Sequence, residues 1–313
     1  MKIVTHIENY QEQTPSILTI GTFDGVHVGH QKIIADLVHQ ANKKKHLAVV
    51  LTFFPHPRMV LQKDIDIKLI DTVEEKQEIL ASLGVDVLVI HPFSKKFSRL
   101  TSLEFIRDLL VNTFKISKVI IGYDHRFGRN REASIKEINQ YGGAYGFEVE
   151  EIPVQEISSV NVSSSKIRNA LKEGDLKKVN TFLNRPYQLS GIVTPGAGLG
   201  RTIDFPTANI KIKETYKLCP PNGVYCVQSK INNKLIQGMM NIGMRPTLDG
   251  KTKTIEVHFF DFSQNLYDQS LTIEILYKIR EEQKFDSLDD LQIQLEKDKK
   301  NCLQLFDSES FDH

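Results

Sequence analysis

The sequence predicts a chain of the α/β class in two parts: a doubly wound parallel-sheet domain, followed by a small antiparallel β-barrel with a terminal helix. In the first part, short runs of Ile, Val and Leu alternate with segments of helical period. In the second, period-two alternation and close turns take over. The length of 313 residues also suits two domains, because a single core usually stops growing near about 250–300 residues. We therefore expect domains at residues 1–184 and 185–313.

The first domain is expected to alternate strands with helices. Continuous apolar runs are typical of strands that are covered on both faces of a sheet, and they occupy residues 16–20, 48–53, 85–90, 118–121 and 147–151. A helical period follows the first run, at Ile33, Ile34, Leu37, Val38 and Ala41. Capping boxes at Thr72 with Glu75 and at Thr101 with Glu104 predict two further helix starts. This alternation predicts a parallel sheet with right-handed crossovers.

The second domain follows a turn at residues 184–186. Strands are expected at residues 223–227, 254–261 and 270–277, with turns rich in Gly, Pro and Asn between them. A final helix is expected to begin at Ser287, with Asp290 as its capping partner. Short alternating strands with close turns are typical of a small antiparallel barrel.

Composition excludes several classes of protein. The chain has 40 Lys+Arg against 39 Asp+Glu, so its net charge of +1 provides no general attraction for nucleic acid or an anionic membrane. The longest apolar stretch, at residues 47–54, is far shorter than the roughly 20 residues of a membrane helix. The start of the sequence lacks the apolar core of a signal peptide. Three cysteines without a CxxC pair argue against a disulfide framework or a thiolate zinc site, and predict a cytoplasmic protein.

A first candidate site lies in the turn GTFDGVHVGH, residues 21–30, between the first apolar strand and the first helix. Ligands of open α/β sheets bind at the carboxyl ends of strands, and the glycines allow a close approach of the backbone. His27 and His30 stand at the helix start, where free amides and the helix dipole favour anions. Two imidazoles there can donate hydrogen bonds to ATP phosphates as charge moves onto the leaving pyrophosphate. The alternative is an ordinary surface pair of histidines, which the strand–turn–helix context disfavours.

A second candidate element is VSSSKIR, residues 162–168, which opens another helix. Serine hydroxyls such as that of Ser164 and helix-start amides can hold phosphate, and Arg168 can clamp it with two N–H groups. Serines in this position can also be simple helix caps. Together with the histidine turn, the segment favours a triphosphate site.

A third candidate site lies in the second domain, in the loop of residues 198–209. Thr207 and Asn209 are two residues apart, so in extended backbone they face the same side, and their hard oxygens suit Mg²⁺ that bridges ATP phosphates. Glu256 lies on the opposite side of its strand from Ile255 and Val257, and a carboxylate that points into a cavity can accept a proton from an attacking hydroxyl. The alternatives are a polar loop and a solvent-facing glutamate. His258 is expected to be an ordinary half-buried imidazole.

The first two motifs resemble those of the HxGH nucleotidyltransferase superfamily. The longer strings GTFDGVHVGHQ, TFFPHPR at 52–58, GYDHRFGRNR at 122–131 and SSSKIR resemble the prokaryotic bifunctional riboflavin kinase/FAD synthetase family. That resemblance implies that His27, His30 and Arg168 act in adenylyl transfer. It also implies a nucleotide site formed by Gly21, Thr22, Phe23, Asp24, Gly29, Asp124, Ser164 and Arg168. The family has an aromatic residue where His125 stands.

The second domain resembles the riboflavin kinase module of the same family, through GRTIDFPTAN, residues 241–247, IEVHFFDF and REEQKF at 280–285. The resemblance implies a nucleotide site at Gly200, Arg201, Thr207 and Asn209. It implies that Mg²⁺ is held at Thr207 and Asn209, and that Glu256 is the base for the ribityl 5′-hydroxyl. It also places Asn241 and Arg280 at the flavin. Asp204 and Asp268 stand where the family usually has glycine.

These resemblances imply a two-site enzyme that phosphorylates riboflavin to FMN with ATP and adenylylates FMN to FAD, with release of pyrophosphate. Its expected ligands are ATP, riboflavin, FMN and FAD, together with Mg²⁺. Neither nucleic acid nor a membrane is an expected partner, and the oligomeric state is left open. One alternative is a nucleotidyltransferase for another phosphorylated acceptor, with the barrel as a binding appendage. A second is a flavin-binding regulator without catalysis, which only Asp204 and Asp268 favour.

Overall fold

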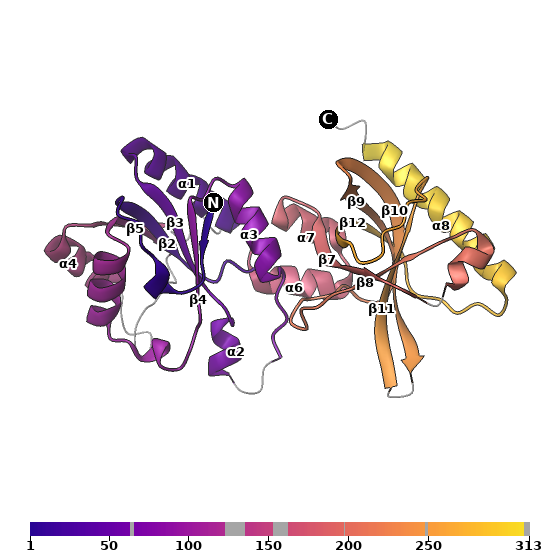
Figure 1. Cartoon of the computed structure of the whole chain (residues 1–313), viewed down its shortest axis with the longest axis horizontal. Helices are drawn as coiled ribbons and strands as arrows, with labels where there is room; N and C mark the ends of the chain where they lie inside the picture. The colour runs from indigo at the N-terminus through magenta and orange to yellow at the C-terminus, as the bar shows by residue number, and fades with distance from the viewer. Residues whose placement is uncertain (63–65, 123–134, 153–161, 197, 248–249, 310–313) are drawn as a thin grey trace. The chain divides into compact units, whose positions relative to one another are not determined.

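The computed structural model describes residues 1–62, 66–122, 135–152, 162–196, 198–247 and 250–309 (Figure 1). The chain divides into two compact units, Met1–Ser164 and Ser165–His313. Helices α6 (Ser164–Glu173) and α7 (Leu176–Leu183) therefore group mainly with the second unit. The functional boundary between residues 184 and 185 stays a prediction.

The first unit is built on one six-stranded sheet with the order β1-β4-β3-β2-β5-β6, and all neighbouring strands pair in parallel. Its strands are β1 (Lys2–Val4), β2 (Ser16–Ile20), β3 (Leu47–Phe53), β4 (Val87–His91), β5 (Ile116–Gly122) and β6 (Glu148–Ile152). The chain runs from β2 outward through β3 to β4, then returns to β5 on the other side of β2. The strand order thus reverses between β2 and β5, which is where open α/β sheets bind their ligands. The predicted doubly wound parallel sheet is confirmed.

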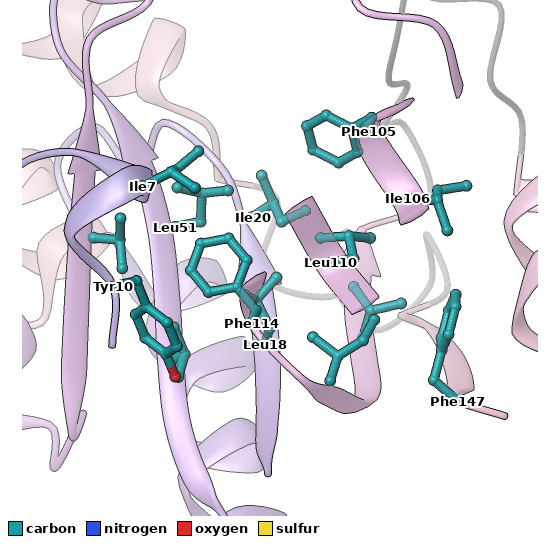
Figure 2. Close-up of a cluster of buried hydrophobic side chains, with 14 of the residues drawn as sticks. Ile7, Tyr10, Leu18, Ile20, Leu51, Phe105, Ile106, Leu110, Phe114 and Phe147 are labelled. Carbon is teal, nitrogen blue, oxygen red and sulfur yellow. The ribbon is translucent and has the colours of Figure 1, made fainter. Parts of the chain in front are cut away.

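Alternate residues of the strands face two different helical layers, as expected for a sheet that is buried on both sides. One layer contains α1 (Val28–Lys44) and α3 (Val73–Ser82), whose apolar residues pack with Ile17, Val50 and Leu88. The other contains η1 (Ile7–Asn9), η3 (Glu104–Thr113) and α4 (Ile135–Tyr145). Figure 2 shows this second core, which consists mainly of Ile7, Tyr10, Leu18, Ile20, Leu51, Phe105, Ile106, Leu110, Phe114 and Phe147.

Both predicted capping boxes form. Thr72 accepts from the amide of Glu75, and the Glu75 side chain accepts from the amide of Thr72. Thr101 and Glu104 make the same pair of bonds ahead of η3. That element is a π-helix rather than the α-helix that the spacing suggests. A short helix, α2 (Pro57–Leu61), begins after His56, whose ring accepts from the amide of Arg58.

The second unit contains a closed antiparallel barrel with the order β10-β11-β8-β7-β12-β9. Its strands are β7 (Tyr187–Thr194), β8 (Ala208–Lys211), β9 (Gly223–Ile231), β10 (Lys234–Thr247), β11 (Gly250–Phe259) and β12 (Ser270–Arg280). A short 3-10 helix, η5 (Leu199–Ile203), lies between β7 and β8. Closure leaves no free sheet edge, so every strand of the barrel has two partners.

The terminal helix α8 (Leu288–Glu309) packs along β10 and β12 (Figure 1). The predicted start is confirmed, because the hydroxyl of Ser287 accepts from the amide of Asp290 at 3.1 Å. Between helix and barrel lies an apolar cluster of Ile203, Phe205, Cys226, Met239, Phe260, Leu276, Cys302 and Phe306. None of the three cysteines forms a disulfide, and Cys226 and Cys302 are buried. Among the described helices, none is long and apolar enough to cross a membrane.

Candidate active sites

The first site is the turn that joins β2 to α1, at the point where the strand order of the sheet reverses. Phe23 and Val26 have φ angles of 45° and 35°, so the backbone turns sharply in a left-handed conformation. Gly25 has a φ of 87°, and a Cβ at this position would lie 2.9 Å from the Ile70 side chain. Only glycine meets both constraints, so the motif spacing follows from the shape of the turn.

The two predicted histidines lie against each other at the start of α1. Their rings are stacked, with centroids 3.6 Å apart and an interplanar angle of 14°. His27 is the N-cap, and its Nδ1 accepts from the amide of His30 at 3.3 Å. Phe23 packs edge-on against the His30 ring, with the centroids 5.2 Å apart. The turn therefore brings His27 and His30 together at a helix N-terminus, where anions are favoured.

Burial keeps both imidazoles neutral at ordinary pH. It lowers the pKa of His27 to about 4, and it holds the pKa of His30 well below its usual value, with smaller contributions from His27 and Lys76. Because Nδ1 of His27 accepts a hydrogen bond, the ring proton of the neutral form is on Nε2, which can donate. Nδ1 of His30 is buried without a hydrogen-bond partner among the described residues. An unpaired buried nitrogen costs roughly 1–3 kcal/mol, which is a reason to expect a ligand there.

Side chains from other elements anchor this turn. The ammonium of Lys76, on α3, donates to the carbonyl oxygen of Thr22 at 2.7 Å, and the Thr52 hydroxyl donates to the same oxygen at 3.2 Å. Asp24 is buried, and its Oδ1 accepts from the amide of Ile70 at 2.9 Å. These bonds fix the backbone between β2 and α1 before any ligand binds.

The other predicted nucleotide residues differ in how the structure places them. Gly21, Thr22, Phe23, Asp24 and Gly29 all lie in the turn. Ser164 begins α6, and its hydroxyl donates to the carbonyl oxygen of Asp24 at 2.9 Å, so it joins the same site. Arg168 is half-buried one helical turn further along α6. Asp124 lies outside the described residues, as does His125, where the family has an aromatic residue by the resemblance.

The second site lies on the barrel, around Glu256. The hydroxyl of Thr207, just before β8, donates to Oε2 of Glu256 at 3.2 Å. Strand pairing places Asn209 of β8 opposite Glu256 of β11, and Glu256 opposite Asn241 of β10. Directly paired residues of antiparallel strands share one face of the sheet. Asn209, Glu256 and Asn241 therefore form a polar row across three strands, with Thr207 bonded to its central carboxylate.

The loop before β8 lies directly against this row. A Cβ at Gly196 would overlap the side-chain amide of Asn209, so a larger residue there would displace that amide from the row. Gly200 and Arg201 lie on η5. The Arg201 guanidinium donates to the hydroxyl of Tyr267 at 2.9 Å. Among the predicted nucleotide residues, Thr207 and Asn209 are thus the ones brought to Glu256 by direct bonding or pairing.

His258 lies two residues after Glu256 and holds the same loop. Its Nδ1 lies 2.9 Å from the carbonyl oxygen of Pro206, which can only accept, so Nδ1 carries the proton. The Phe205 ring packs against the imidazole, with the centroids 4.9 Å apart. Burial lowers the pKa of His258. The expected half-buried imidazole is in fact buried, and it ties β11 to the residue before Thr207.

The Arg280 guanidinium already has a charged partner within the unit. Its Nε and Nη2 donate to the carboxylate of Asp298 on α8, the shortest contact being 2.7 Å, and that carboxylate is fully buried. The guanidinium also lies over the Phe285 ring, 5.8 Å from its centroid. Arg280 thus joins the end of β12 to α8. Its contact with flavin stays a prediction.

The donors around Glu256 fit a Mg²⁺ ion. A hydroxyl, a carboxamide and a carboxylate gather at Thr207, Asn209 and Glu256. Mg²⁺ prefers hard oxygen ligands and retains several waters, so a small set of oxygens beside ATP phosphates suffices. Within the described part of the chain, no cluster of three or more His, Cys, Asp or Glu side chains could hold a metal. The fit therefore depends on the neutral oxygens of Thr207 and Asn209, which lie beside the carboxylate of Glu256.

A parallel sheet with a histidine turn at its switch point, joined to a barrel with a hydroxyl–amide–carboxylate row, defines a nucleotide-using transferase with two sites. The family model for FAD synthetase matches residues 9–166, and that for riboflavin kinase matches residues 183–306. The chain belongs to the family of bifunctional riboflavin kinase/FMN adenylyltransferases. The resemblance to this family that the sequence motifs indicate is confirmed.

Relatives resemble the chain along nearly its whole length. The bifunctional riboflavin kinase/FMN adenylyltransferase of Bacillus subtilis is 37% identical, over 95% of this chain and 94% of the relative. That of Escherichia coli K12 is 35% identical, over 98% of both chains. A crystal structure described as a macrolide-efflux protein from Streptococcus pneumoniae is 30% identical, with a TM-score of 0.86, and covers 95% of this chain and 97% of that one.

Sequence reasoning missed two residues that shape these sites. Lys76 reaches Thr22 across 54 positions, and its sequence signal is weak: a lysine in the first turn of a helix, where the dipole disfavours cations. Gly196 belongs to the glycine-rich run before η5, and its contact with Asn209 becomes visible only once the strands pair.

Proposed function

We propose that this chain is a two-step flavin enzyme, which phosphorylates riboflavin to FMN with ATP and then adenylylates FMN to FAD with release of pyrophosphate. The two family matches on one chain support both activities. The observation that carries the proposal is the Glu256 row, because it joins a base to oxygen donors that suit a Mg–ATP complex.

In the kinase step, the oxygen of the ribityl 5′-hydroxyl attacks the γ-phosphorus of ATP, and ADP leaves. Glu256 accepts the proton of that hydroxyl during the attack. Thr207 holds the carboxylate in position, and His258 holds the loop that carries Thr207. Asn241, opposite Glu256, is available to bind the flavin side of the substrate. When bound, Mg²⁺ neutralises charge on the phosphate oxygens. Thr207 and Asn209 are the residues that would hold the ion.

In the adenylyl step, a phosphate oxygen of FMN attacks the α-phosphorus of ATP, and pyrophosphate leaves. The neutral His27 and His30 donate hydrogen bonds to phosphate oxygens, where negative charge increases in the transition state. Ser164 and the free amides at the start of α1 add donors, and Arg168 is proposed as a bidentate clamp. No covalent intermediate with the protein is needed.

The substrates of this function are ATP, riboflavin and FMN, and we propose that each site uses its own ATP. The division of labour at residues 184 and 185 and the cytoplasmic location stay predictions. Incubation of the purified chain with riboflavin, ATP and Mg²⁺, followed by chromatographic separation of the flavins, tests the proposal. FMN should appear first and FAD after it. An incubation that yields neither product would refute the assignment. Conversion of phosphopantetheine or nicotinamide mononucleotide in place of FMN would favour another acceptor.

A further inference from the structure

A buried lysine lies beneath the histidine turn. Lys76 is in the first turn of α3 and is only 7% exposed. A cation in this position is unfavourable twice, because the helix dipole opposes it and burial removes its water. Desolvation accordingly lowers the pKa of Lys76. A side chain placed at such a cost needs compensation from its surroundings.

The compensation comes from the turn itself and from two buried carboxylates. The Lys76 ammonium donates to the carbonyl oxygen of Thr22 at 2.7 Å. Asp24, in the turn, and Asp71, just before α3, are each 1% exposed, and their charges favour the ammonium form of Lys76. Asp24 in turn accepts from the amide of Ile70. Lys76 therefore offsets the charges of Asp24 and Asp71 directly beside the segment that is expected to bind a polyanion.

This charge balance matters for nucleotide binding. A triphosphate that approaches Asp24 and Asp71 without a nearby cation would be repelled, and charges in a partly buried site are poorly screened. The carbonyl that Lys76 holds lies in the same turn as His27 and His30, whose stacked geometry depends on the backbone of that turn. Lys76 also contributes, after burial and His27, to the lowered pKa of His30.

We propose that Lys76 is a positioning residue for adenylyl transfer: it holds the Thr22 carbonyl and offsets Asp24 and Asp71, so that the turn keeps the shape that seats the triphosphate of ATP. The inference rests on the proposed function of the first unit. Lys76 acts through the turn, without contact to the reacting atoms.

Three variants test the role of Lys76. Lys76→Met keeps the length and removes the charge, Lys76→Arg keeps charge and donor, and Lys43→Met changes an exposed lysine of α1 as a control. We expect Lys76→Met to lower kcat/KM for Mg–ATP in FMN adenylylation at least about tenfold, because small misplacements of bound groups are costly. Lys76→Arg should recover most of this loss. Lys43→Met should match the parent, and riboflavin phosphorylation should be unchanged in all three proteins.

A double variant separates charge balance from fold stability. Adding Asp71→Asn to Lys76→Met removes one of the two carboxylates whose charge Lys76 offsets, so it should lower KM for Mg–ATP relative to Lys76→Met alone. A kcat/KM for Mg–ATP in Lys76→Met that lies within twofold of the parent value would overturn the inference. So would a loss that Asp71→Asn leaves unchanged or deepens, since Lys76 would then only stabilise the fold.

A measurement without turnover distinguishes this inference from the proposed function. The His30 amide is bonded to His27 within the turn, so its hydrogen exchange reports the geometry of the turn in the ligand-free protein. Lys76→Met should accelerate this exchange, while exchange in β9 and β12 stays as in the parent. If the parent makes no FAD but the exchange changes as expected, the proposed function fails, whereas the role of Lys76 in holding the shape of the turn stands. If exchange is unchanged, the positioning role fails.

Discussion

The hydroxyl of Thr207 donates a 3.2 Å hydrogen bond to Oε2 of Glu256, and this bond joins the loop before β8 to β11. The carboxylate is held in place before any substrate is present, with Asn209 and Asn241 paired opposite it on the neighbouring strands. A base that is fixed in this way avoids the rate loss of about 10²-fold that a 1 Å misplacement can cause. The barrel thus provides rigid support for the proposed proton acceptor.

Substitution of Glu256 should separate the two activities. Glu256→Gln keeps the shape of the side chain and removes the base, so kcat for riboflavin phosphorylation should fall about 10²–10⁴-fold. Supplied FMN should still be converted to FAD at the rate of the parent. The matched control is Glu274→Gln on β12, where the carboxylate accepts from Gln228 instead. Turnover is measured by chromatography of the flavins. Unchanged kinase turnover in Glu256→Gln would show that Glu256 is not the base.

Substitution of His30 should have the opposite effect. His30→Ala removes a stacked imidazole from the start of α1, so FAD formation should fall at least about 10²-fold, as for loss of a transition-state donor. FMN should accumulate, because the barrel retains Glu256. His39→Ala, at an exposed position of the same helix, provides the control and should keep both activities. Loss of both activities in a folded His30→Ala protein would contradict separate sites.

The neutral state of His27 predicts that the first unit loses stability in acid. The folded pKa of about 4 lies below the ordinary value of 6.5, so between these pH values the unfolded chain binds more protons than the native one. The contribution of His27 to the free energy of unfolding is therefore fully present above pH 6.5, and it is lost as the pH falls toward 4. His27 alone should account for about 2 kcal/mol between pH 7 and pH 5. Protonation of Nδ1 would also remove the acceptor of the His30 amide.

Urea unfolding at pH 7 and pH 5, followed by amide exchange in β2 and β3, measures this loss. The informative variant is His27→Asn, because asparagine is a good N-cap that does not titrate. The difference between the two pH values should shrink by about 2 kcal/mol in this variant. Equal acid sensitivity of parent and variant would show that His27 titrates normally in the folded protein.

The fold class could be predicted because the hydrophobic period changes once, from runs with helical spacing to alternation. Strands β2 to β6 fall within two residues of their predicted positions for this reason. Strand β7 also lies outside the predicted strands, although its buried Tyr187, Leu189 and Val193 alternate with less buried residues. The other missed strands lacked such a signal. β1 has three residues, of which Lys2 and Ile3 are exposed, and β8 has four. β10 contains Gly238 and Pro246, which are typical of turns and strand edges.

The candidate sites could be predicted only as far as short motifs reach. GTFDGVHVGH and PTAN are local, and the structure gives their residues the expected turn and extended backbone. The row from Asn209 through Glu256 to Asn241 depends on strand register, which a sequence pattern specifies only by face. The Lys76–Thr22 and His258–Pro206 contacts span 54 and 52 positions and join different elements. Tertiary packing produces them, so no local pattern could reveal them.

Asp204 and Asp268, which stand where the motif resemblance leads us to expect glycine, share one backbone feature, and that feature predicts the effect of replacing them. Asp204 and Asp268 have φ angles of 61° and 63°, in the left-handed region where glycine is unstrained and aspartate is tolerated. Asp204→Gly and Asp268→Gly should therefore keep or raise the free energy of unfolding, by at most about 1 kcal/mol. Asp204→Ala and Asp268→Ala should lower it by about 1 kcal/mol, since alanine lacks the local hydrogen bonding that helps aspartate there.

Urea unfolding of the four variants beside the parent measures these changes. Asp286→Gly is the control, because Asp286 is exposed and is not among the residues of positive φ. There glycine only adds freedom to the unfolded chain, so stability should decrease by up to about 1 kcal/mol. Strain at the two aspartates would be refuted if their glycine variants lost as much stability as Asp286→Gly. A gain at both sites would show that glycine relieves backbone strain that the aspartates carry in the left-handed conformation.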